Sequence, residues 1–169
     1  MFKNDLFAFN FKTGKSEPIT RDGKWNAIIN GGTDWVYEEE FAFTRAFFWS
    51  ADSKKVAYYR FDESHVKEFS MTMSGELYPE EYKFKYPKAG EANAFIDLYI
   101  YNIGTGKKVK VDIGAEKDQY IPRIKWTKNP DKLAVMRMNR LQNQVEVLMV
   151  NASDGSSKVI LTEKENYLC

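Results

Sequence analysis

Three consecutive glutamates, Glu38 to Glu40, are the residues whose types and spacing most directly suggest chemistry. Adjacent carboxylates repel one another and raise each other's pKa unless a cation lies between them, so an empty pair is poised for a cation. Carboxylates that converge on an ammonium group form charge-assisted hydrogen bonds, which are roughly twice as strong as neutral ones. The alternative is a solvated acidic surface, and three adjacent glutamates by themselves favour that alternative.

A local element must bring two neighbouring carboxylates together if they are to bind one cation. Neighbouring residues on a regular helix do not face the same way, so convergence requires a short or distorted helical turn. We predict such a turn for about residues 34–43. Thr33 or Asp34 could cap its start, and acidic residues early in a helix suit the helix dipole.

Composition limits the fold and the classes of function. The chain has 169 residues, of which 43% are hydrophobic and 15% aromatic, which favours a folded, β-rich chain over disorder. Lys and Arg number 25 and Asp and Glu number 24, so the formal net charge is +1. This balance leaves no electrostatic footprint for nucleic acid, and we predict no nucleic-acid partner.

Nucleophiles and metal ligands are scarce. Cys169 is the only cysteine and His65 the only histidine, which excludes an internal disulfide and argues against a zinc site. The Gly-x-Ser-x-Gly pentapeptide of triad hydrolases is absent. We therefore predict no catalytic residue, metal or cofactor in this chain. No signal-peptide pattern or membrane-length apolar run occurs, so any targeting segment is expected outside it.

Internal repeats predict the architecture. Residues 5–15 align without gaps on residues 97–107, and a third copy occupies residues 146–156. Each copy is a short apolar strand, an Asn, two variable residues and a turn with Thr-Gly or Asp-Gly. A further strand follows, so each copy is typical of a β-hairpin in which Gly adopts a positive φ.

A second repeat alternates with the first. Trp49 is followed seven residues later by Val56, and Trp126 by Leu133 at the same spacing, each pair indicating an inner hairpin. One inner and one outer hairpin make a four-stranded antiparallel blade of a β-propeller, which typically has four to eight blades. We predict an all-β fold of about two and a half blades with a short helical insert, and regard a β-sandwich as the alternative. The predicted units are an outer hairpin (residues 1–25), the glutamate insert (33–43), a second blade (44–115) with an arm (67–91), and a third blade (116–169).

The run Asp34-Trp35-Val36-Tyr37-Glu38-Glu39-Glu40 strongly resembles the double-glutamate motif of dipeptidyl peptidase IV, in the prolyl oligopeptidase family of serine peptidases. Further similarity extends in consistent order over most of the chain, at Trp49-Ser50, Val56-Ala57-Tyr58, Tyr86-Pro87-Lys88-Ala89-Gly90, residues 120–126 and residues 140–143.

The resemblance implies a function for a larger parent protein. Members of that family combine an eight-bladed propeller with an α/β-hydrolase domain and release Xaa-Pro or Xaa-Ala dipeptides from peptide N-termini. By resemblance, Glu39 and Glu40 bind the substrate's α-ammonium, whereas Glu38 is structural or exposed. The parent is expected to be exported, and this chain to need the remaining blades and the hydrolase domain as partners. A related branch with a different product preference, and a non-catalytic interaction module, are the alternatives.

The segment between the two halves of the second blade is predicted to form an extended arm. Tyr82, Phe84 and Tyr86 alternate with lysines, which is a strand signal. An arm at this place takes part in homodimerisation in the resembling family, and the alternative is a hairpin packed on its own propeller. The residues assigned to the partner surface are Phe69, Met71, Tyr78, Tyr82, Phe84 and Tyr86. Methionines at strand positions, namely Met71, Met73, Met136, Met138 and Met149, are predicted to fill the core.

Overall fold

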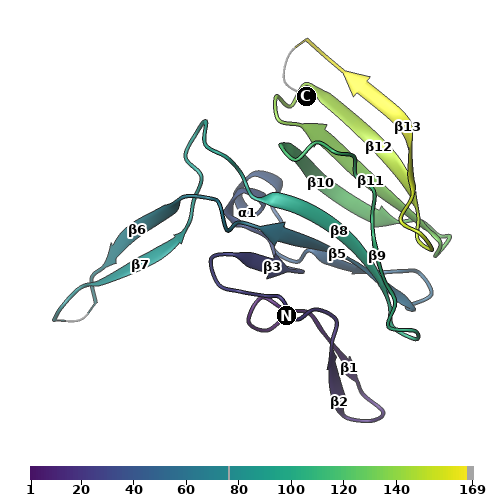
Figure 1. Cartoon of the computed structure of the whole chain (residues 1–169), viewed down its shortest axis with the longest axis horizontal. Helices are drawn as coiled ribbons and strands as arrows, with labels where there is room; N and C mark the ends of the chain where they lie inside the picture. The colour runs from purple at the N-terminus through teal and green to yellow at the C-terminus, as the bar shows by residue number, and fades with distance from the viewer. Residues whose placement is uncertain (76, 167–169) are drawn as a thin grey trace.

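The computed structural model describes residues 1–75 and 77–166, so Cys169 and the prediction that rests on it lie outside the described residues. The described part contains thirteen strands and one helix, and all strand pairs are antiparallel. The strands form the hairpin and the two larger sheets that the repeats predict, together with a separate two-stranded arm (Figure 1). The prediction of an all-β, blade-built fold with one short helix is confirmed.

The second blade has an innermost strand in two pieces. Its elements are β3 (Ile28–Asn30), β4 (Phe47–Trp49), β5 (Lys55–Asp62), β8 (Phe95–Asn102) and β9 (Lys108–Lys110). Both β3 and β4 pair with β5, one along each half of it. The N–H of Ala46 donates to the carbonyl of Gly31 at 3.0 Å and closes the loop between them. The intervening residues, which include α1 (Trp35–Phe41), are therefore an insert in one strand.

The third blade follows the regular pattern. It consists of β10 (Gln119–Trp126), β11 (Lys132–Asn139), β12 (Gln144–Asn151) and β13 (Ser157–Lys164), paired in chain order. The register of β10 on β11 shifts between Tyr120 and Arg123, where β10 contains one more residue than its partner. Such a bulge leaves backbone groups of the longer strand unpaired within the sheet.

The hairpins of the repeat use glycine as the sequence predicts. Gly106 and Gly155 follow β8 and β12 with φ of +69° and +79°, a region that glycine occupies without steric cost. Gly155 has a second role, because a Cβ there would overlap the carbonyl oxygen of Lys110 in β9. The N–H of Asp112 donates to the carbonyl of Gly155 at 2.8 Å, so this turn holds the second and third blades together.

The two blades share one hydrophobic core. Its fully buried members include Tyr59, Phe61, Ile121, Leu133 and Val135. Polar contacts cross the same boundary: the indole Nε1 of Trp126 donates to the carbonyl of Phe48 at 2.9 Å, and Lys55 Nζ lies 2.9 Å from Asp131 Oδ1. The blades therefore pack face to face, as adjacent blades of a propeller do.

A hairpin precedes the second blade and an arm interrupts it. The hairpin is β1 (Phe7–Asn10) with β2 (Lys15–Pro18), and the arm is β6 (Glu68–Met73) with β7 (Glu80–Lys85). The arm projects away from the sheets between β5 and β8 (Figure 1). Among the described residues no helix is long and apolar enough to cross a membrane.

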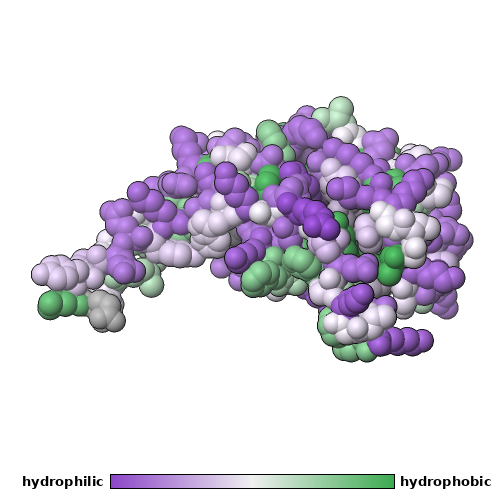
Figure 2. Space-filling model, turned by 60° about the horizontal axis from the view of Figure 1, so that its bottom comes forward, coloured by the Kyte–Doolittle hydropathy of each residue, from purple (hydrophilic) through white to green (hydrophobic). Residues whose placement is uncertain are grey.

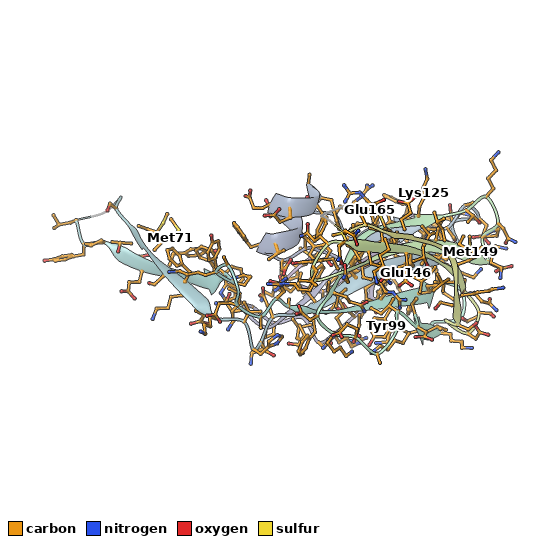
Figure 3. All side chains as sticks on the ribbon, turned by 90° about the horizontal axis from the view of Figure 1, so that it is seen from above. Met71, Tyr99, Lys125, Glu146, Met149 and Glu165 are labelled. Atoms are coloured by element: carbon orange, nitrogen blue, oxygen red, sulfur yellow. The ribbon has the colours of Figure 1, made fainter. Side chains whose placement is uncertain are left out.

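The prediction that the methionines fill the core is wrong for most of them. Met71 and Met73 are 44% and 53% exposed on the arm, which Figure 3 shows extending from the body of the protein with Met71 labelled. Met136 is 36% exposed on β11, whereas Met138 is buried. Strand position alone does not decide burial, because alternate residues of one strand face opposite sides of a sheet.

Candidate functional site

The helix that carries the glutamates begins and ends sharply. The side-chain Oδ1 of Asp34 accepts a hydrogen bond of 3.0 Å from the N–H of Tyr37, which caps the N-terminus. Ala42 follows the last helical residue in the left-handed conformation, with φ 54° and ψ 45°, and ends the helix after seven residues. The short turn predicted for residues 34–43 lies here, and it places Glu39 and Glu40 near the C-terminal end of α1.

Tyr37 anchors this helix in the core. Its ring is 2% exposed and contacts Phe41 and Phe61 at centroid distances of 4.9 Å each. Its phenolic oxygen accepts a hydrogen bond of 2.7 Å from the N–H of Ile121. Burial raises the pKa of the Tyr37 hydroxyl well above its usual range, so the group stays neutral.

The bulge of β10 is the place where the third blade contacts α1. The carbonyl of Ile121 accepts a hydrogen bond of 3.0 Å from the hydroxyl of Tyr59 on β5. Both backbone groups of Ile121, which the bulge removes from the strand ladder, are thus bound by tyrosines of the second blade. The glutamate helix is therefore fixed to both blades at one residue.

The three glutamates are exposed on α1 and form no ion pair within residues 1–75 and 77–166. On a regular helix, adjacent side chains leave the axis about 100° apart, so Glu39 and Glu40 must bend towards each other if they are to share a ligand. Glu40 lines a pocket of about 320 Å³, whereas Glu38 lines a different pocket beside the root of the arm. Glu40 and Glu38 therefore line different concavities.

The pocket beside Glu40, here termed the aromatic pocket, is walled by Trp35, Phe41, Tyr86 and Tyr120. Trp35 and Tyr86 pack edge to face at a centroid distance of 4.3 Å, which holds α1 against the segment that leaves the arm. The guanidinium of Arg140 also lines the pocket. The resembling segments around Tyr86 and Arg140 thus meet the glutamate helix in space.

Two buried carboxyls lie at the other end of α1. Burial raises the pKa of the Asp34 carboxyl to about 6, although the hydrogen bond from the N–H of Tyr37 opposes the shift. Burial, followed by the nearby charge of Asp34, raises the pKa of Glu63 to about 7, with Lys85 opposing. Asp34 caps the start of the helix, and both carboxyls line the concavity beside the arm root that Glu38 also lines.

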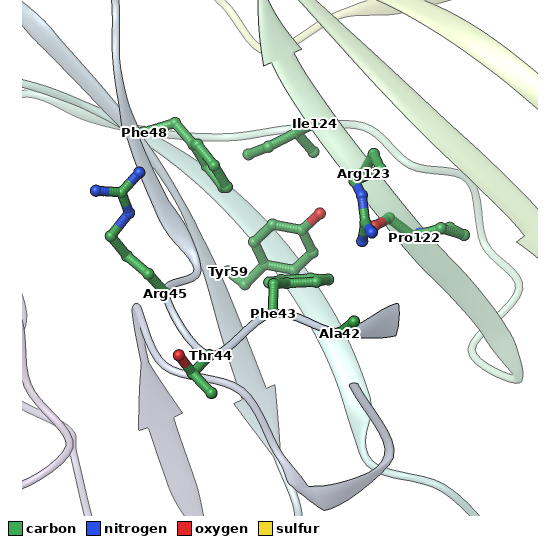
Figure 4. Close-up of a pocket in the computed structure, with 9 residues that line it drawn as sticks. All are labelled: Ala42, Phe43, Thr44, Arg45, Phe48, Tyr59, Pro122, Arg123 and Ile124. Carbon is green, nitrogen blue, oxygen red and sulfur yellow. The ribbon is translucent and has the colours of Figure 1, made fainter. Parts of the chain in front are cut away.

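A third concavity, which the sequence did not suggest, has a volume of about 370 Å³. We term it the arginine pocket and define it by Phe43, Arg45, Phe48, Tyr59 and Arg123 (Figure 4). Arg45 precedes β4 and Arg123 belongs to β10, and the two lie on opposite sides of the Phe43 and Tyr59 rings in this view. No periodicity or motif could have joined two arginines so distant in sequence.

The contacts of His65 are typical of a structural role. His65 stacks on Phe95 at 4.1 Å, and its Nε2 lies 2.9 Å from the carbonyl oxygen of Asn93. Within the part of the chain that the structure describes, no group of three or more Asp, Glu, His or Cys residues could hold a metal ion.

The residues assigned to the partner surface gather on the arm. Phe69 is paired across the strands with Phe84, and Met71 with Tyr82, so the four share one face. The ring of Phe84 contacts those of Tyr82 and Tyr86 at centroid distances of 5.7 and 6.2 Å. Tyr78 lies near the arm tip and is 80% exposed. Figure 2 shows hydrophobic atoms at this tip among largely hydrophilic neighbours.

Four-stranded antiparallel blades with a helical acidic insert in an innermost strand define a segment of a β-propeller. Residues 1–168 match the family described as the dipeptidyl peptidase IV (DPP IV) N-terminal region, and the chain belongs to that family. The resemblance on which the sequence prediction rested is therefore confirmed.

Solved and curated relatives agree with this assignment. The crystal structure of dipeptidyl peptidase 4 from Porphyromonas gingivalis matches with a TM-score of 0.93 and 43% sequence identity, over 98% of this chain and 24% of that one. Two fungal proteins named probable dipeptidyl-aminopeptidase B, from Phaeosphaeria nodorum and Uncinocarpus reesii, are 34% and 31% identical over 95% of this chain. This chain spans 19% of the length of each of these two curated relatives.

Proposed function

We propose that this propeller segment binds the N-terminal α-ammonium of peptide substrates through Glu39 and Glu40, in a serine exopeptidase that releases Xaa-Pro or Xaa-Ala dipeptides. The observation that carries the proposal is a pair of exposed carboxylates, without ion pairs among the described residues, on a helix anchored in the core by Tyr37. Family membership supports the dipeptidyl peptidase setting. Bond cleavage is assigned to a hydrolase domain, since this chain lacks the Gly-x-Ser-x-Gly pentapeptide.

The chemistry of an ammonium site explains how an exopeptidase measures one dipeptide from a chain end. A free N-terminus has a pKa near ~8 and is mostly charged at neutral pH. Two carboxylates provide charge-assisted acceptors for its N–H donors. An internal peptide bond or an acetylated terminus offers neither the charge nor the donors, so it is rejected.

The test is kinetic and uses the full-length protein that carries this segment. We expect Glu39→Gln and Glu40→Gln each to lower kcat/KM for a Gly-Pro amide by roughly tenfold to a hundredfold, the range for a hydrogen bond to a charged group. Glu38→Gln is the matched control, since it removes the same charge one residue away, and we expect a change below about twofold.

Unchanged kinetics in both variants would reduce the glutamates to a solvated surface and favour the alternative of a non-catalytic interaction module. Hydrolysis of a Gly-Pro amide by the purified 169-residue chain would contradict the assignment of cleavage to a separate domain.

A second proposal concerns the arm, which we infer to be a homodimer contact. Exposed apolar residues of a two-stranded ribbon support it, namely Met71, Met73, Leu77, Tyr78 and Tyr82. A two-stranded ribbon by itself is marginally stable in water, so an apolar partner surface would stabilise it. Trp25 reaches Tyr82 at a centroid distance of 6.2 Å, which covers only part of the aromatic face from within the chain.

A further inference from the structure

The arginine pocket lies where the innermost strands of two blades approach each other. Arg123 belongs to β10, the first strand of the third blade, and Arg45 lies two residues before β4, which belongs to the first strand of the second blade. The innermost strands of propeller blades surround the central channel. With the first strand of each blade innermost, the pocket would border the central channel of the closed propeller.

Both arginines are held in place without being neutralised. The guanidinium of Arg123 lies 5.1 Å from the ring centroid of Phe43, and that of Arg45 lies 5.9 Å from the ring of Phe47. A guanidinium that stacks on a ring keeps N–H donors along its edge for other partners. Among the described residues neither arginine forms an ion pair, and the pocket lining contains no carboxylate.

The pocket is close to the proposed ammonium site along the chain. Consecutive Cα atoms lie about 3.8 Å apart, so the Cα of Phe43 is at most ~11 Å from that of Glu40. The arginine pocket shares no lining residue with the aromatic pocket that Glu40 lines, so a substrate held by its ammonium at Glu39 and Glu40 reaches it by directing its first side chain along the chain towards Phe43. An acidic first residue would be repelled by the two glutamates unless a positive charge nearby offset them.

We infer that the arginine pocket binds an anionic side chain on the N-terminal residue of the peptide, Asp or Glu, and that Arg45 and Arg123 thereby determine specificity. The inference rests on the proposed function, since the ammonium contact is what places the first side chain. The aromatic wall formed by Phe43 and Phe48 contacts the methylene groups, and the guanidinium edges bind the carboxylate.

The test compares two isosteric substrates of the full-length protein, a Glu-Pro amide and a Gln-Pro amide. We expect the native protein to have the higher kcat/KM for Glu-Pro. Arg45→Gln and Arg123→Gln are each expected to lower the Glu-Pro to Gln-Pro ratio by roughly threefold to tenfold, and the double variant by more, while Gly-Pro hydrolysis changes by less than about twofold. The ratio should also fall as salt is added, because the arginines are exposed.

Lys125→Gln is the matched control. It removes one positive charge from β10, two residues beyond Arg123, at a position that does not line the pocket, and the ratio should stay unchanged. Arg123→Lys keeps the charge but removes the planar fork that stacks on Phe43, so it should keep only part of the preference.

A Glu-Pro to Gln-Pro ratio at or below one in the native protein, or an unchanged ratio in the double variant, would overturn the inference. So would a ratio lowered as much by Lys125→Gln as by Arg123→Gln. These outcomes are separate from failure of the proposed function, which is measured by the response of Gly-Pro hydrolysis to Glu39→Gln and Glu40→Gln.

Discussion

The phenolic oxygen of Tyr37 accepts a hydrogen bond of 2.7 Å from the backbone N–H of Ile121, which joins the glutamate helix to the bulge of the next blade. The residue that forms this contact precedes the glutamates by one to three positions. The helix is too short to be stable by itself. Its position therefore depends on this buried anchor.

Removing the hydroxyl should loosen the bulge. We expect Tyr37→Phe to destabilise the protein by about 1–3 kcal/mol, since it leaves the N–H of Ile121 buried without an acceptor. Hydrogen–deuterium exchange of the β10 backbone should become faster at Ile121. Tyr82→Phe on the arm is the control, because that residue is 46% exposed. Equal exchange rates in the two variants would show that the contact is dispensable.

The buried carboxyls predict a pH dependence of stability. The folded-state pKa values of Asp34 and Glu63 are raised to about 6 and about 7, above the ordinary 3.8 and 4.5. As pH rises, the unfolded chain loses these protons first, so the free energy of unfolding decreases from about pH 4 to about pH 7. Below this window both states are protonated and the effect vanishes.

Glu63→Gln should remove the larger part of that slope and stabilise the protein above pH 7. Thermal unfolding at several pH values measures it, and Glu163→Gln on the exposed strand β13 is the control. The prediction would be contradicted if the free energy of unfolding of the native protein rose between pH 5 and 7. It would also be contradicted if Glu63→Gln left this pH dependence unaltered.

Two glycines at equivalent hairpin turns, Gly106 and Gly155, allow the energetic contribution of the contact between the blades to be measured separately. Gly106→Ala adds strain from its positive φ alone, because the nearest atom to a new Cβ is the Tyr101 hydroxyl at 3.7 Å. Gly155→Ala adds the same strain and an overlap with Lys110. We expect Gly106→Ala to destabilise the protein by about 1–2 kcal/mol. Gly155→Ala should destabilise it by roughly 1–3 kcal/mol more. Equal losses in thermal unfolding would mean that the blades separate there without cost.

If the arm forms a homodimer contact, negative charges introduced on its apolar face should disrupt the dimer. Met71 and Tyr82 face each other across the two strands, and both are partly exposed. We expect the double variant Met71→Glu and Tyr82→Glu to convert a dimer of the full-length protein into a monomer in light scattering. Phe11→Ser, at a 91% exposed position of the first hairpin, should leave the mass unchanged. A dimer that survives the double variant would exclude the arm as the contact.

Much of the site was accessible from the sequence, because its signals are local. The run from Asp34 to Glu40 predicted a capped short helix, and the structure caps it at Asp34. The roles of Glu39 and Glu40 remain predictions, to be tested by the kinetics above. The arginine pocket was missed, since Arg45 and Arg123 belong to different blades and no spacing rule relates them.

The sequence by itself determined the hairpins, because turn glycines and alternating apolar residues act within a few positions of the chain. The repeats therefore predicted β8 and β12 and the blades that contain them. Only the tertiary structure decided that β3 and β4 are two halves of one strand, joined by their common pairing with β5. It also decided that Tyr37 and Tyr59 meet at Ile121. Such contacts depend on where a bulge and an insert place backbone groups in space, and no local pattern encodes that placement.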